Sequence, residues 1–447
     1  MNKSILELHE MLINKEISSK ELVEQSLKKS HEVQDKCNAF VTILDEAKES
    51  TVTDELISGI PFGVKDNFST KDILTTGSSN TLKNYVPVYT ATVVQNLLDK
   101  GAVMVNKPTL DEFGMGSTGT TCHTGTVLNP WDTSRMCAGS SAGSACAVAS
   151  GVIPFALGSD TGDSVRKPAA YCGIVGYKPT YGMLSRYGLF PYASSLDHVG
   201  VLTRYVSDAA IAVDAMKEKD PHDMTSWDSG NIHLFDSLGK DIKGKKLFYI
   251  KELCDINNYP HANCELQEHL ANFHKTLDKF KKLGITIEGV SFPKELLRAI
   301  PAVYMVISYA EATSNMSNLA GISFGVRSQK KNITEMIKEH RTLGFSPLIK
   351  RRFVIGSYVL QSENQERYFK NAARARRLIV DKMLELFKNF DALIMPVGSG
   401  PAKKFDDHKK VEDEMEKILE DHLQIGNFGG FPSITIPNGF INNLPVG

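Results

Sequence analysis

The sequence predicts a layered α/β/α fold around a central mixed β-sheet. Short apolar runs of strand length alternate with helical patterns along the chain, and this alternation is typical of helices packed on both faces of a sheet. The 447 residues contain no internal repeat and no low-complexity segment. Because a large α/β enzyme of this length can be one folding unit, we expect a single domain over residues 1–447.

The chain opens with two predicted helices. Ser4 and Ser18 are each followed by a glutamate at the third position after them and by apolar residues at helical spacing. This is the capping-box pattern, in which the serine and the glutamate satisfy backbone N–H groups at a helix start. We therefore expect a helical N-terminal segment over residues 4–33.

The elements that follow are predicted from apolar runs bounded by glycine or polar residues. Residues 294–318 and 332–389 have mainly helical patterns, so we expect a helical insertion over about 294–389 between core strands. The predicted strands are 39–44, 59–65, 101–105, 152–157, 246–250, 285–290, 392–395 and 433–437, and the helices between the early strands are 90–100 and 141–150.

The composition excludes several classes of function. A formal net charge of −1 gives no overall basic field that would attract nucleic acid. The longest apolar stretch, residues 299–312, is too short to cross a bilayer, and the N-terminus lacks a signal-peptide pattern. Seven scattered cysteines without CxxC spacing fit a reducing compartment. We expect a cytoplasmic protein with no membrane contact and no metal site.

The stretch 138–168, AGSSAGSACAVASGVIPFALGSDTGDSVRKP, carries the strongest chemical signal. Two serine-bearing loops of small residues flank a helix-then-strand pattern, and upstream Lys65 ends a predicted apolar strand. A serine becomes a nucleophile only when a nearby base takes its proton. Lys65 is the candidate base, because burial lowers the pKa of a lysine. The alternatives are a strand-end lysine that reaches water and a helix-capping role for Ser140.

A second interpretation of the same stretch is a Ser-His-Asp hydrolase. Residues 139–143 match the GxSxG elbow with Ser141 as nucleophile, and His198 follows Asp197. That elbow requires a strand immediately before it, whereas residues 129–137 have a loop composition. We therefore expect no Ser-His-Asp triad.

These strings resemble the amidase signature family, whose members cleave amides with a Lys–Ser–Ser triad. The resemblance implies an amidase fold with its signature core over residues 59–215, Ser164 as nucleophile and Lys65 as base. It also implies that Ser140 follows a cis peptide bond and relays the proton. The backbone N–H groups expected to form the oxyanion hole, each worth about 3–4 kcal/mol, belong to Thr161, Gly162, Asp163 and Ser164.

Asp163 departs from the family pattern, which usually has glycine at this place. Aspartate keeps the backbone N–H and tolerates unusual backbone angles. A carboxylate that pointed toward the oxyanion would repel it, so we expect the Asp163 side chain to point away.

The pieces SRYGL and SSLD in residues 185–197 resemble one branch of the family, the A subunits of glutamyl-tRNA(Gln) amidotransferases. The resemblance implies that glutamine is the substrate and that its ammonia converts Glu-tRNA(Gln) to Gln-tRNA(Gln). Arg352 would bind the α-carboxylate of glutamine and Asp421, or its neighbour Glu420, the α-ammonium group. Tyr304 and Ser141 would add hydroxyl groups.

The same resemblance implies two partner chains. The B subunit would use ATP and Mg²⁺ and hold most of the tRNA, and a small C subunit would join it to this chain. No Walker-type string is present, in agreement with ATP chemistry elsewhere, so we expect no cofactor here. The alternatives are a stand-alone amidase that acts on another amide and an inactive scaffold subunit, which Asp163 alone favours.

Overall fold

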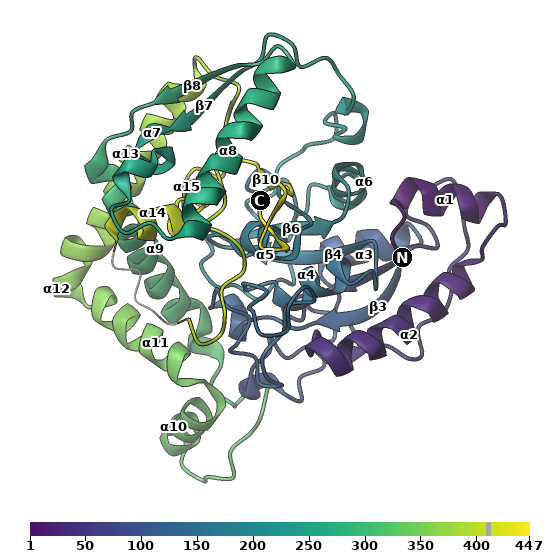
Figure 1. Cartoon of the computed structure of the whole chain (residues 1–447). Coiled ribbons are helices and arrows are strands. Elements are labelled where there is room, and N and C mark those ends of the chain that lie inside the picture. The colour runs from purple at the N-terminus through teal and green to yellow at the C-terminus, as the bar shows by residue number, and fades with distance from the viewer. Residues whose placement is uncertain (408–412) are drawn as a thin grey trace.

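The protein is described from a computed structural model, and the structure describes residues 1–407 and 413–447. Its centre is a seven-stranded mixed sheet (Figure 1). Strand β2 is parallel to its neighbours β3 and β4, and the other pairs are antiparallel. The strands in spatial order are β1 (Phe40–Ile43), β3 (Val103–Pro108), β2 (Pro61–Val64), β4 (Phe155–Asp160), β6 (His198–Thr203), β5 (Val175–Lys178) and β10 (Ser433–Thr435).

Helices cover both faces of this sheet. One face packs against α1 (Ile5–Ile13), α3 (Thr92–Asp99) and α6 (Val206–Met216). The opposite face packs against α2 (Ser19–Cys37), α4 (Ala142–Ala149) and α5 (Arg166–Cys172). Each face has its own apolar core, and Figure 1 shows the purple helices α1 and α2 on the two sides. The predicted α/β/α arrangement with a mixed sheet is confirmed.

The N-terminal helices begin where the sequence predicts. Ser4 and Ser18 both make complete capping boxes with Glu7 and Glu21. Helix α2 continues to Cys37, slightly beyond the predicted end at residue 33, and a left-handed Asn38 ends it.

A second sheet lies apart from the first. The parallel strands β8 (Thr286–Val290), β7 (Lys246–Ile250) and β9 (Ala392–Leu393) form it, with α7 (Lys251–Cys254) and α8 (Cys264–Lys282). The sequence predicted these strands without separating them from the central sheet. A short apolar run shows that a strand is half-buried, but it does not say which neighbour the strand pairs with.

The predicted helical stretch over 294–389 is present beside the second sheet and shares a large apolar core with it (Figure 1). None of the helices in the described part of the chain is both long and apolar enough to cross a membrane. The helices of this stretch are α9 (Lys294–Asn315), α10 (Ile333–Gly344), α11 (Pro347–Leu360), α12 (Ser362–Gln365) and α13 (Asn371–Phe387), followed by α14 (Glu414–Asp421), α15 (Gln424–Phe428) and the strands β11 (Phe440–Ile441) and β12 (Leu444–Pro445).

Some strand predictions were displaced or missing. The apolar run at 152–157 begins in a turn, because the Val152 N–H donates to the Ala147 carbonyl, so β4 starts only at Phe155. Strands β5 and β6 were missed because a glycine interrupts each pattern. An added Cβ at Gly176 would lie 2.6 Å from Ala169 Cβ, so glycine there lets α5 pack closely on β5.

Candidate active site

Three chain segments meet at one edge of the central sheet. Lys65 directly follows β2, and residues 161–164 directly follow β4. Since β2 and β4 are parallel neighbours, their carboxyl ends lie at the same edge. Ser140 and Ser141 stand just before α4, which packs against β4. The fold therefore brings the predicted base and both serine loops together.

Lys65 is fully buried and surrounded by hydroxyl groups. Its Nζ lies 2.8 Å from Ser140 Oγ, 2.9 Å from Ser141 Oγ and 2.9 Å from Ser159 Oγ. Burial lowers the pKa of Lys65 to about 7, and the carboxylate of Asp111 is the largest opposing influence. A large fraction of this lysine is therefore neutral near neutral pH, as a general base requires.

The neighbouring Asp66 points away from Lys65, as expected for adjacent residues at a strand end. Its Oδ2 accepts a hydrogen bond of 2.5 Å from Thr76, and its Oδ1 lies 3.8 Å from the Nζ of Lys107. Lys65 therefore has no ion-pair partner among the described residues.

The peptide bond between Gly139 and Ser140 is cis, as the family resemblance implied. An added Cβ at Gly139 would lie 1.9 Å from Asp111 Oδ2, so only glycine fits here. Asp111 is tied to the backbone of residues 118–121.

The Ser-His-Asp interpretation does not fit this geometry. The residues before Ser141 form no strand. His198 Nδ1 lies 2.7 Å from the Leu196 carbonyl oxygen, and Asp197 accepts a hydrogen bond of 2.6 Å from Thr161. Neither residue reaches Ser141 by a hydrogen bond.

Ser164 lies beside this cluster. The Ser141 N–H donates to the Ser164 carbonyl at 3.2 Å, which joins the two serine loops through their backbones. The Ser164 hydroxyl makes no hydrogen bond to another described residue. The Ser140–Ser164 proton relay therefore stays a prediction.

The loop between β4 and α5 has the features of an oxyanion hole. None of the N–H groups of residues 161–164 donates a hydrogen bond within the described part of the chain. Arg166 Nη2 donates to the Gly162 carbonyl at 2.8 Å. Since N–H and C=O point in opposite directions across a trans peptide, the Asp163 N–H faces away from Arg166. These donors are therefore available to a ligand.

A buried ion pair fixes this loop. Arg166 Nη2 lies 2.9 Å from Asp160 Oδ1 and donates to Asn427 Oδ1 at 2.6 Å. Although burial opposes it, Arg166 holds the pKa of Asp160 well below its usual value. Asp160 also accepts from the Val165 N–H at 3.0 Å. Asp160 and Asn427 were not among the predicted site residues.

Arg352 presents a partly buried cation without a carboxylate partner among the described residues. Its Nη1 donates to the Tyr192 hydroxyl at 2.7 Å, and its guanidinium lies 4.8 Å from the ring centre of Tyr309. The Nε atom is buried and has no hydrogen-bond partner in the described structure. An anionic ligand would satisfy this group.

Glu420 and Asp421 differ sharply in their surroundings. The carboxylate of Glu420 lies 2.6 Å from Lys167 Nζ and 2.9 Å from Lys403 Nζ, so it is already neutralised. Asp421 accepts only from the Gln424 side chain, at 3.0 Å, and has no ion pair within the described residues. Burial raises its pKa. Of the two alternatives, the geometry favours Asp421 as the group that is open to a cationic ligand.

Tyr304 connects the helical stretch to the oxyanion loop. An added Cβ at Gly162 would lie 2.9 Å from the Tyr304 ring, so the ring packs directly against the loop. Burial raises the pKa of the Tyr304 hydroxyl, which keeps it protonated and able to donate.

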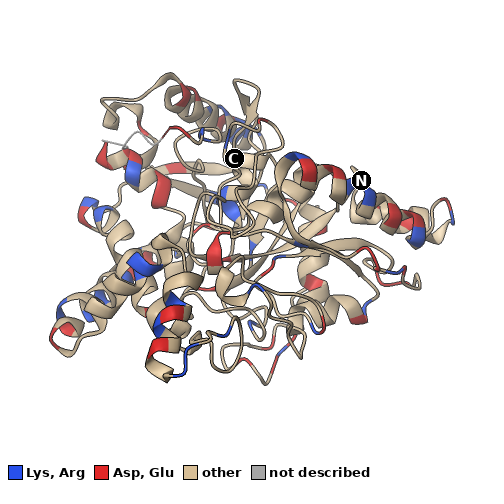
Figure 2. Ribbon diagram, turned by 90° about the horizontal axis from the view of Figure 1, so that it is seen from below, with Lys and Arg blue, Asp and Glu red and all other residues tan. Residues whose placement is uncertain are grey.

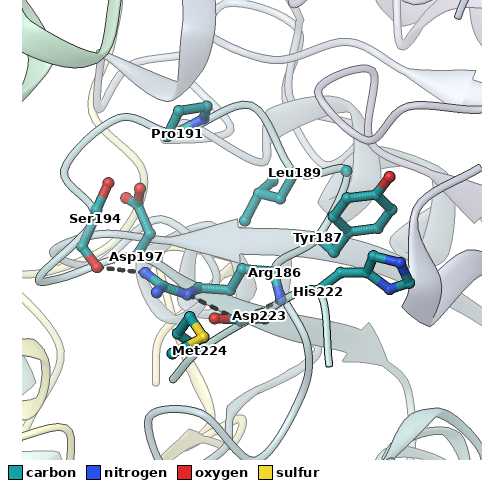
Figure 3. Close-up of a pocket in the computed structure, with 10 residues that line it drawn as sticks. Arg186, Tyr187, Leu189, Pro191, Ser194, Asp197, His222, Asp223 and Met224 are labelled. Carbon is teal, nitrogen blue, oxygen red and sulfur yellow. Dashed lines mark hydrogen bonds and ion pairs between the residues drawn. The ribbon is translucent and has the colours of Figure 1, made fainter. Parts of the chain in front are cut away.

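A cavity of about 280 Å³ lies beside residues 186–197 (Figure 3). Arg186 crosses it and contacts the Ser194 carbonyl and the Asp223 carboxylate. The cavity contains none of the predicted catalytic residues. It meets the site only through Asp197, which holds Thr161.

The basic run of residues 374–377 is taken up by contacts within the chain. Arg374 and Arg377 pair with Glu366 and Asp381, and Arg376 turns inward to Ser195. Acidic and basic residues are interspersed along the ribbon (Figure 2). Within residues 1–407 and 413–447, no cluster of His, Cys, Asp or Glu could hold a metal ion.

The fold and this site define an amidase. The family model described as Amidase matches residues 21–447, and the chain belongs to this family. The A subunit of glutamyl-tRNA(Gln) amidotransferase from Streptococcus pneumoniae (strain Hungary19A-6) is 39% identical to it, over 100% of this chain and 91% of the relative. The crystal structure of the Thermotoga maritima protein of that name has a TM-score of 0.82 and 34% identity, with 100% of this chain and 90% of that one covered. Peptide amidase from Stenotrophomonas maltophilia, at 22% identity and a TM-score of 0.78, shares the fold, with 100% and 92% covered.

Proposed function

We propose that this chain is the glutamine-hydrolysing subunit of a glutamyl-tRNA(Gln) amidotransferase. One observation carries the proposal. The site holds a partly buried cation, Arg352, and a partly buried anion, Asp421, neither with an ion-pair partner among the described residues. An amino acid amide carries the complementary pair of charges. A simple neutral amide would leave both groups unpaired in a desolvated pocket, which is costly.

In the proposed reaction, the Ser164 hydroxyl attacks the side-chain amide carbon of glutamine. Its proton passes through Ser140 to neutral Lys65, and the N–H groups of residues 161–164 bind the negative oxygen that forms. The proton then moves to the leaving nitrogen, and ammonia departs. Water then takes the place of ammonia: it gives a proton to Lys65 through Ser140 and its oxygen attacks the acyl carbon. The ester bond to Ser164 breaks, the proton returns to Ser164 Oγ and glutamate leaves.

The relatives are named as subunits of an amidotransferase, so we expect a partner subunit to use the ammonia. We propose that this partner, the B subunit, uses ATP and Mg²⁺ to activate Glu-tRNA(Gln) and holds most of the tRNA, and that a small C subunit joins the two. This chain then needs no cofactor of its own, and the complex works in the cytoplasm. A stand-alone amidase and an inactive scaffold remain as competing outcomes of the experiment.

The test compares Arg352→Ala with Arg351→Ala in the complex. Arg351 is the exposed neighbour and makes no ion pair among the described residues. Loss of a buried charge pair costs about 2–5 kcal/mol, so KM for glutamine should rise at least about tenfold in Arg352→Ala only. Ammonia release from a small neutral amide should hardly change.

Equal losses for glutamine and the neutral amide would mean that Arg352 supports the fold and does not bind glutamine. Wild-type hydrolysis of the neutral amide without hydrolysis of glutamine would favour a stand-alone amidase. No hydrolysis of either would favour a scaffold.

A further inference from the structure

Asp163 belongs to a charged cluster beside the nucleophile that lacks one positive charge. Lys167 Nζ lies 2.6 Å from Glu420 and 3.8 Å from Asp163 Oδ2, and Lys403 lies 2.9 Å from Glu420. Asp421 follows Glu420 at the end of α14, where the charges of Lys167 and Lys403 act on its carboxyl group and its own charge acts on Asp163. The cluster thus holds three carboxylates and two ammonium groups, and it is largely buried.

The missing charge is not supplied by neighbouring elements of the described structure. On α5, Arg166 is taken up by Asp160, which lies at the end of β4. From α9, Tyr304 faces the loop and carries no charge, because its pKa is raised. Among these neighbours, only Lys167 is within ion-pair distance of Asp163, and it lies closer to Glu420.

The direction of the Asp163 side chain is consistent with a missing positive charge in the cluster. It turns toward Lys167 and is 15% exposed, so it faces the charged cluster rather than bulk water. Its backbone N–H belongs to the oxyanion loop. Asp163 also directly precedes Ser164, the proposed nucleophile, in the sequence. An uncompensated carboxylate there would disfavour the negative oxygen that forms on the substrate.

We infer that Asp163 and Asp421 together form the site for the α-ammonium group of the substrate, so that Asp163 selects amides that carry a cationic amino group. The inference rests on the proposed function. The bound ammonium supplies the missing positive charge and neutralises Asp163. An amide without the amino group leaves Asp163 negative beside the oxyanion and reacts poorly.

The protonation of Asp163 supports this inference. Burial raises the pKa of Asp163 to about 7; Lys167 opposes the rise, while Asp160 and Asp421 add to it. In the empty site, a proton therefore replaces the missing cation at pH 6, and the carboxylate is ionised at pH 8. Since the ammonium must displace that proton, glutamine should bind more tightly as pH rises from 6 to 8, with proton release that fades above pH 8.

The test uses calorimetry on the complex that carries Ser164→Ala, which binds without turnover. The ligands are glutamine and 4-carbamoylbutanoate, which lacks only the amino group. Adding Asp163→Asn should weaken glutamine binding about tenfold at pH 8 and abolish most of the proton release at pH 6.5, whereas binding of 4-carbamoylbutanoate should stay equal or tighten. Asp236→Asn, at an exposed aspartate, is the matched control and should change neither ligand.

With Ser164 intact, Asp163→Asn should slow hydrolysis of glutamine and accelerate hydrolysis of 4-carbamoylbutanoate. Asp163→Gly removes the carboxylate without putting an amide in its place, and it should change both rates in the same directions. It replaces Asp163→Asn in the test if that variant folds poorly. Unchanged glutamine affinity and unchanged proton release in both variants would overturn the inference while glutamine hydrolysis stood. Failure of the Ser164→Ala complex to bind glutamine at all would instead overturn the proposed function, and the inference with it.

Discussion

At the scale of single residues, the proposed chemistry depends on the burial of Lys65. Water is excluded from its amine, so burial lowers its pKa to about 7 while three hydroxyl groups still accept or donate hydrogen bonds to it. A surface lysine would stay charged at neutral pH and could not accept a proton.

The first prediction concerns the pH dependence of glutamine hydrolysis. At saturating glutamine, where tighter binding no longer adds to the rate, kcat should rise as Lys65 loses its proton, with a midpoint near pH 7, and level off above it. Lys65→Ala should reduce kcat by about 10²–10⁴-fold. Lys65→Arg should fail as well, because arginine stays protonated at working pH. A Lys65 variant that kept the wild-type rise with pH would show that another group titrates.

The sequence predicted the residues of this site that sit in recognisable strings, namely Lys65, Ser140, Ser141 and the loop 161–164. It did not predict Ser159 or Asp111, whose roles depend on contacts between distant segments. Ser159 lies in β4, five residues before Ser164. A polar residue inside a buried strand is unusual, and this could have indicated a functional role for Ser159. The sequence around Asp111 gave no comparable indication, because its contact with Gly139 is known only from the structure.

At the scale of elements, the loop between β4 and α5 is held by the pair of Asp160 and Arg166. The pair is buried and also binds the Gly162 carbonyl and Asn427 of α15. The loop between β4 and α5 is therefore positioned by groups on three elements, namely Asp160 at the end of β4, Arg166 of α5 and Asn427 of α15.

Arg166→Ala should destabilise the protein strongly. Removal of one partner leaves Asp160 as a buried, unpaired charge, which costs about 3–5 kcal/mol. Chemical denaturation of the purified protein measures the loss. Arg374→Ala, which breaks an exposed pair with Glu366, should have a far smaller effect. Similar denaturation midpoints for the two variants would contradict this account of the loop.

The sequence predicted most elements of the central sheet, and where it failed the reasons are local. Polar residues at the end of β4 and glycines inside β5 and β6 weaken the strand pattern, although all three strands are buried. The separate second sheet could not be predicted, because strand pairing over long sequence distances leaves no periodic signal.

At the scale of the whole molecule, the site forms where the central sheet meets the helical stretch of residues 294–389. The predicted catalytic groups come from the sheet edge, whereas Tyr304 and Arg352 come from α9 and α11 (Figure 1). The relative position of these two regions therefore decides whether glutamine can be held against Ser164.

Gly162→Ala should test this contact. The added Cβ would lie 2.9 Å from the Tyr304 ring, so the loop and α9 must move apart and kcat for glutamine should fall. Tyr304→Ala in the same chain makes room, and the double variant should be more active than Gly162→Ala alone. Ammonia release measures both. A double variant less active than either single variant would show that the loop is disturbed for another reason.

The most direct measurement is ammonia release from glutamine by the complex that carries Ser164→Ala, with exposed Ser357→Ala as control. Ser164 is the proposed nucleophile, so release should fall to background in Ser164→Ala and stay normal in the control. Ammonium chloride should still allow the Ser164→Ala complex to amidate Glu-tRNA, because only the ammonia source is lost. Near-normal release of ammonia by Ser164→Ala would contradict the account and return the nucleophile to Ser141.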